Sequence, residues 1–138
     1  MPRILAIDFG SKRAGLAVTD PLQIIASPLA AVAAKDVLDF IKDYIAKEPV
    51  ECFVIGEPRN LDGTATHATP LVEKFIQSLK KTFPTIPVKT MDESFTSKTA
   101  ARALAEGNFK KKERRKKENL DKISATLILQ SYMQTIKQ

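Results

Sequence analysis

The sequence predicts one α/β domain in which a mixed β-sheet is covered by helices. The chain has 138 residues, the usual size of a domain, with no Gly/Ser linker and no internal repeat, so we expect residues 1–138 to form a single domain. Its first part contains short apolar runs joined by turns, which predicts antiparallel strands. Strand and helix patterns alternate after that, which adds further strands and covering helices to the same sheet.

The first three strands are expected before residue 34. Residues 3–9 form an apolar run ending in Asp8-Phe9-Gly10, which is typical of a buried strand. A short polar turn bounded by glycine follows, and the apolar residues 16–18 then predict the second strand of a hairpin. A third strand is expected within residues 23–33, at the edge of the sheet because of Pro28.

Helices and strands alternate in the rest of the chain. Apolar residues at helical spacing predict a first helix over residues 36–47 and a second that begins near Thr69-Pro70. Strands are expected at residues 51–56 and 86–91, and further helices at residues 96–106 and 119–137. The inward stripe of the last helix comprises Ala125, Ile128, Leu129, Tyr132, Met133 and Ile136.

Composition narrows the class of protein. The balance of apolar and charged residues is that of a soluble globular protein, and no apolar run could cross a bilayer, so we expect no membrane association. The N-terminus reaches Asp8 too soon for a signal peptide. Cys52 has no partner for an internal disulfide and is expected to be a small buried strand residue. These features favour a cytoplasmic protein.

Positive charge is concentrated in one segment. The net charge is +6, and residues 110–118 alone contribute +5. Such a run repels itself unless an anion neutralises it, and a nucleic-acid backbone would do so. A merely solvated surface run is the alternative. The basic residues expected to bind nucleic acid here are Lys110, Lys111, Lys112, Arg114, Arg115, Lys116 and Lys117.

Two aspartates occupy positions that stability alone does not explain. Asp8 alternates onto one face with Ile4 and Ala6 in a strand that otherwise looks buried, and a bare carboxylate there is costly. Asp121 lies four residues before Ala125, in line with the inward stripe of the last helix. A helix cap or first-turn acid is the alternative for Asp121.

Asp92 and Glu93 follow the predicted strand at residues 86–91, at the kind of strand end where α/β sheets build sites, although an ordinary polar turn would explain them alone. Together with Asp8 and Asp121 they predict a site for hard divalent cations, Mg²⁺ or Mn²⁺. Such ions support phosphoryl displacement. Lys12 and Arg13, in the turn after Asp8, would meet phosphate, although a polar hairpin turn is an adequate explanation of that segment.

Four segments together resemble the YqgF family, also called RuvX-like proteins, of the RNase H-like superfamily. They are residues 8–20, 56–64, 92–97 and 121–125, which occur in family order and span nearly the whole chain. The resemblance implies an RNase H-like fold with a five-stranded mixed sheet. It also implies a metal-dependent nuclease that matures the 5′ end of pre-16S rRNA during ribosome biogenesis.

The resemblance also assigns residues. Asp8, Glu93 and Asp121 match the acidic triad of the family, and Lys12 and Arg13 match its basic turn. Ser94 replaces the usual arginine and Glu57 a commonly apolar residue. Because related junction resolvases carry a glutamate near that strand end, Glu57 is an expected supplementary ligand, as is Asp92.

Two other functions stay open at this point. A Holliday junction resolvase acting on structured DNA would use the same metal chemistry, and a non-catalytic RNA-binding assembly factor would need none. We expect RNA as the partner, with four-way DNA as the alternative. Monomer and homodimer are both compatible with the sequence.

Overall fold

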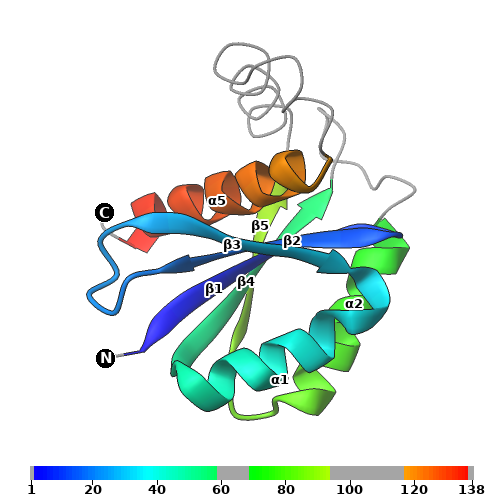
Figure 1. Ribbon diagram of the computed structural model, residues 1–138, viewed down its shortest axis with the longest axis horizontal. Coiled ribbons are helices and arrows are strands. Elements are labelled where there is room, and N and C mark those ends of the chain that lie inside the picture. Colours follow the sequence, from blue (N-terminus) through cyan, green and yellow to red (C-terminus); the bar gives the residue numbers. More distant parts are fainter. Residues whose placement is uncertain (1, 59–68, 94–116, 137–138) are drawn as a thin grey trace.

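The computed structural model of the chain describes residues 2–58, 69–93 and 117–136 (Figure 1). The predicted helix at residues 96–106 therefore lies outside the described residues. The described elements are strands β1 (Arg3–Phe9), β2 (Arg13–Thr19), β3 (Ala26–Ala33), β4 (Val50–Pro58) and β5 (Val88–Glu93), the 3₁₀ turn η1 (Ala34–Asp36), and helices α1 (Val37–Lys47), α2 (Thr69–Thr82) and α5 (Lys117–Ile136).

The five strands form one mixed sheet in the order β3-β2-β1-β4-β5. The pairs β1–β2 and β2–β3 are antiparallel, whereas β1–β4 and β4–β5 are parallel. Three antiparallel strands followed by parallel additions confirm the predicted architecture. Because β1, β4 and β5 run in one direction, their carboxyl ends meet at the same edge of the sheet, which we call the carboxyl edge.

Each face of the sheet has its own apolar core. On one face, Leu5, Ile7 and Phe53 belong to the cluster that includes the buried residues of α1 and α2. On the other, Ile4 and Ala6 belong to the cluster of α5. This alternation follows from the two-residue repeat of a strand. Of the described helices, Figure 1 shows α5 on one side of the sheet and α1 and α2 on the other.

β3 lies at the edge of the sheet, as its proline predicts. β3 pairs only with β2 among the described strands, and Pro28 lies within it, near a register shift opposite Leu16 and Ala17. A proline cannot donate to a ladder, so an outer strand tolerates it. The expected edge position of this strand is confirmed.

Three details differ from the sequence prediction. β2 begins at Arg13, so Gly15 lies inside a strand rather than in the turn. β5 continues to Glu93, because its polar end still pairs with β4. Ile136 is 50% exposed, so the inward stripe of α5 ends at Met133.

Cys52 is buried, as expected, in the cluster under α5. Burial raises the pKa of its thiol, while the hydrogen bond with Tyr132 acts in the opposite direction. None of the described helices combines the length and apolar character needed to cross a membrane.

Candidate active site

Asp8 lies at the carboxyl edge on the α5 face. It is the next-to-last residue of β1 and is half-buried, and it continues the alternation of Ile4 and Ala6, which pack in the α5 cluster. The last residue, Phe9, turns to the opposite face, where its ring stacks on Phe75 of α2 at a centroid distance of 4.1 Å. This stacking fixes the end of β1 to a helix and so restricts the backbone of Asp8.

Glycines flank Asp8 on both neighbouring strands. Gly15 of β2 is its direct partner in the ladder. On the other side, Ile7 pairs with Ile55 of β4, so the next position along β4 is Gly56. Neither glycine is among the site residues predicted from the sequence. A glycine inside an apolar strand run is the signal that would have found them, because it often marks a close approach of a ligand or another backbone.

The ends of β4 and β5 bring the other acidic strand residues to the same edge. Glu57 pairs with Asp92, and Pro58 with Glu93. Met91 packs in the α5 cluster, so position 93 has the parity of the α5 face. Positions 57 and 92 have the opposite parity, on the face of α1 and α2. The backbone thus places position 93, rather than the two supplementary candidates, on the same face as Asp8.

Asp121 lies in the first turns of α5. Met133, near the end of α5, and Ala26, the first residue of β3, line one groove. This groove lies at the end of the sheet where β1 also begins. Asp121 lies 12 residues earlier, about 18 Å along the helix axis. This offset brings the start of α5 to the carboxyl edge, and Figure 1 shows its orange end beside the arrow tip of β4. Positions 8, 93 and 121 therefore share one edge and one face of the sheet.

The predicted basic turn is compact. The N–H of Gly10 donates to the carbonyl oxygen of Arg13 at 2.9 Å, and a Cβ on Gly10 would lie 2.9 Å from that oxygen. Glycine is therefore required for the turn to close. Lys12 is exposed at the turn and Arg13 is half-buried.

The described side chains alone do not form a metal site. No group of three or more His, Cys, Asp or Glu residues in the described part of the chain could hold a metal ion. The side chains of Glu93 and Asp121 lie outside that description, as do Ser94 and residues 110–116 of the basic run, while Lys117 begins α5. Carboxylates at positions 8, 93 and 121 form a donor set of oxygen atoms only, which suits Mg²⁺ or Mn²⁺.

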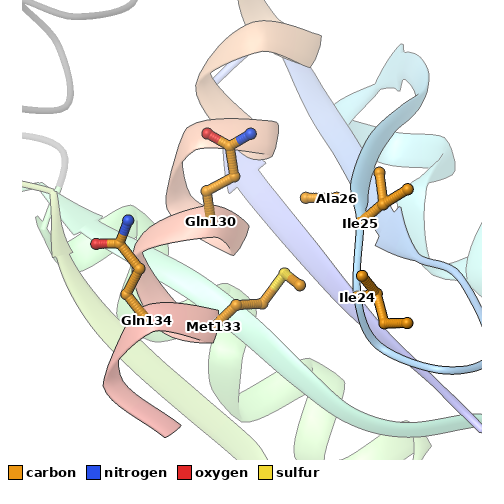
Figure 2. A pocket seen from close by; sticks show the side chains of 6 residues that line it. All are labelled: Ile24, Ile25, Ala26, Gln130, Met133 and Gln134. Carbon is orange, nitrogen blue, oxygen red and sulfur yellow. The ribbon is translucent and has the colours of Figure 1, made fainter. Parts of the chain in front are cut away.

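A groove away from the carboxyl edge has a different chemistry. A groove of about 440 Å³ is lined by Ile24, Ile25, Ala26, Gln130, Met133 and Gln134 (Figure 2). It contains no charged side chain and lies over the C-terminal half of α5, far from the carboxyl edge. Its lining offers no group for metal binding or acid–base chemistry.

Comparison with known proteins decides the family. A family model described as RuvX, Holliday junction resolvase, matches residues 2–135. The chain belongs to the RuvX family. The protein named "Putative pre-16S rRNA nuclease" in Amoebophilus asiaticus is 54% identical over 138 residues, covering 100% of this chain and 98% of the relative. The protein of that name in Flavobacterium psychrophilum is 46% identical over 133 residues, covering 96% and 97%.

Solved structures confirm the fold. The Fowlpox virus resolvase, solved with Holliday junction DNA, matches with a TM-score of 0.60 and 13% identity over 99% of both chains. RuvC of T. thermophilus, solved in complex with a Holliday junction substrate, matches with a TM-score of 0.51 and 16% identity over 98% of both chains. The RuvX chain therefore has the RNase H-like resolvase fold that its motifs predict, and identities this low carry no argument on substrate.

Proposed function

We propose that this RuvX protein is a metal-dependent nuclease that processes pre-16S rRNA, at its 5′ end. What supports the proposal is the backbone arrangement, in which positions 8 and 93 share one edge and one face of the sheet and Asp121 belongs to the first turns of the helix that covers this face. The nucleases named above support it, because they are similar to this chain over nearly their whole length. Such a role in rRNA maturation predicts a cytoplasmic protein.

Asp8, Glu93 and Asp121 would hold the divalent cation, and Asp8 is the member with a described side chain. A bound Mg²⁺ or Mn²⁺ would supply a polarised phosphoryl oxygen and an activated water for phosphodiester hydrolysis. Phe9, stacked on Phe75, holds the backbone next to Asp8, so the carboxylate needs little rearrangement when substrate binds. Lys12 and Arg13 would bind phosphates beside the cleaved bond. The lysines and arginines within residues 110–117 would bind further phosphates of the RNA backbone.

A four-way DNA junction is the second candidate substrate. The family model that matches the chain favours this substrate, because the model is described as a Holliday junction resolvase. The relatives at 46–54% identity carry the name of an rRNA nuclease instead. We give these nearer relatives more weight than the family description, because fold and general chemistry are shared across both substrates.

Cleavage assays separate the candidates. The purified protein is incubated with a pre-16S rRNA fragment and, in parallel, with a four-way DNA junction, each with Mg²⁺, Mn²⁺ or chelator. We expect metal-dependent cleavage of the RNA and little cleavage of the junction. Preferred cleavage of the junction would establish the resolvase instead. RNA binding with no cleavage under any metal, and unchanged in Asp8→Asn, would establish a non-catalytic assembly factor.

A further inference from the structure

Backbone contacts bring Lys35 next to the basic turn. The N–H of Ala34 donates to the carbonyl oxygen of Lys12 at 2.9 Å, and Arg13 pairs with Ala33 at the end of the β2–β3 ladder. Lys35 follows directly, in η1. It therefore lies beside Lys12, although the two are far apart in the sequence. We call Lys12, Arg13 and Lys35 the basic corner.

The two lysines of the basic corner carry positive charge at the surface. Lys12 and Lys35 are both exposed. Neither forms a salt bridge with another residue in the described ranges, in contrast to Arg3, whose guanidinium contacts Glu48 at 3.3 Å. Asp36, the next residue after Lys35, is also exposed and offsets part of the charge. The corner still has an excess of positive charge, which favours binding of a polyanion.

The sheet order places the basic corner on one side of Asp8. β2 and β3 lie on one side of β1, and β4 and β5 lie on the other. Position 93, at the end of β5, belongs to the β4–β5 side of the carboxyl edge. β3 is two strands from β1, about 10 Å at the usual strand spacing. A nucleic-acid strand that crosses Asp8 along this edge toward β3 must pass over the basic corner.

We propose that Lys35 is a positioning residue that binds a backbone phosphate of the RNA substrate, beyond the phosphates met by Lys12 and Arg13. This inference rests on the proposed nuclease function. Lys35 would fix the path of the RNA on the β3 side of Asp8 without touching the reacting atoms. One phosphate contact to single-stranded nucleic acid changes the slope of log K, where K is the binding constant, against the logarithm of the salt concentration by about 0.7.

The test compares Lys35→Gln with the matched control Lys47→Gln. Lys47 is also exposed and ends α1, about 16 Å from the start of that helix and next to Glu48, which contacts Arg3 at the amino end of β1. Binding of a pre-16S rRNA fragment is measured from about 50 to 200 mM KCl with chelator present, so that cleavage does not interfere. Cleavage kinetics with Mg²⁺ are measured separately.

We expect Lys35→Gln to lower the magnitude of the slope of log K against log salt concentration by about 0.7. It should also raise KM with little change in kcat. Lys47→Gln should leave the slope and KM unchanged. The same slope in Lys35→Gln and in the unchanged protein would overturn the role of Lys35 and leave the nuclease function standing. An equal loss in both variants would also overturn it, because it would reflect general surface charge. Failure of the unchanged protein to bind the RNA would overturn the proposed function together with this inference.

Discussion

Asp8 lies directly opposite Gly15 in the antiparallel ladder of β1 and β2, at the carboxyl edge of the sheet. Directly opposed residues project to the same face, so the position beside the Asp8 carboxylate has no side chain on the β2 side. The position on the β4 side, Gly56, has none either. A glycine inside a strand adds little stability, because it has no side chain to pack. The two glycines on either side of the candidate metal ligand can therefore be tested for a role in the site.

Adding one methyl group beside Asp8 should impair cleavage more than folding. In Gly15→Ala the new Cβ would stand directly opposite Asp8, about 4.5–5.5 Å from its Cβ. It would fill space that a bound cation or phosphate would otherwise use, and a displacement of about 1 Å in a catalytic group can cost about 100-fold in rate. We expect kcat for pre-16S rRNA cleavage to fall by about that factor while the urea midpoint of unfolding changes little. Full activity in a folded Gly15→Ala protein would show that the space beside Asp8 is not used.

The loop between β2 and β3 should lose stability in acid. Asp20 accepts hydrogen bonds from the N–H groups of Ile25 and Ile24, at 2.7 Å each, and of Leu22, at 3.2 Å. These bonds hold the pKa of Asp20 below its ordinary value. A carboxyl group whose pKa is lower in the folded state stabilises the protein above its unfolded pKa, and this contribution disappears as the pH falls through the folded pKa.

The variant Asp20→Asn therefore has a lower Tm than the unchanged protein at pH 7, and the difference should shrink as the pH falls below about 4, the pKa of an ordinary aspartate. Asp43→Asn, an exposed site on α1, serves as the control and should show a small difference at every pH. A difference for Asp20→Asn that stays constant with pH would contradict the account, because it would arise from packing rather than from ionisation.

Cys52 should be chemically inert in the folded protein. Its burial raises the pKa of the thiol, and the thiolate is the reactive species. We expect slow reaction with a thiol reagent at pH 7 and rapid reaction of the same protein in denaturant. Equally fast reaction in both conditions would mean that the cluster beneath α5 opens readily, contrary to its close packing.

The local pattern of apolar and turn residues in the sequence predicted most of the fold. The hairpin, the edge position of Pro28 and the helices α1, α2 and α5 follow from apolar periodicity and from turn residues, which are properties of neighbouring residues. The end of β5 was not predicted, because Asp92-Glu93 reads as a polar turn and only the pairing with β4 reveals it as strand. The side of the sheet that carries Asp8 could likewise be inferred from alternation with Ile4 and Ala6.

Relationships between distant segments could not be predicted. No local pattern shows that Gly56 lies next to Asp8, because the β1–β4 register is set by packing of the whole sheet. The approach of Lys35 to Lys12 depends on the pairing of β2 with β3 and on a backbone hydrogen bond between the β1–β2 turn and η1. Asp8 and Asp121 stand out in the sequence because each is unusual in its own element, whereas Glu93 was assigned by the family resemblance. The common edge of positions 8 and 93 emerges only from the topology.

In the proposed mechanism, residues 8, 93 and 121 act as one metal-dependent unit. Its most direct test is the rate of Mn²⁺-dependent cleavage of pre-16S rRNA by Asp8→Asn, Glu93→Gln and Asp121→Asn, with Asp43→Asn as the folded control. We predict that each of the three variants loses at least about 100-fold in rate and that the triple variant is hardly worse than any single one, because residues acting as a unit are not additive. Full cleavage by any folded member of the three would contradict the shared site.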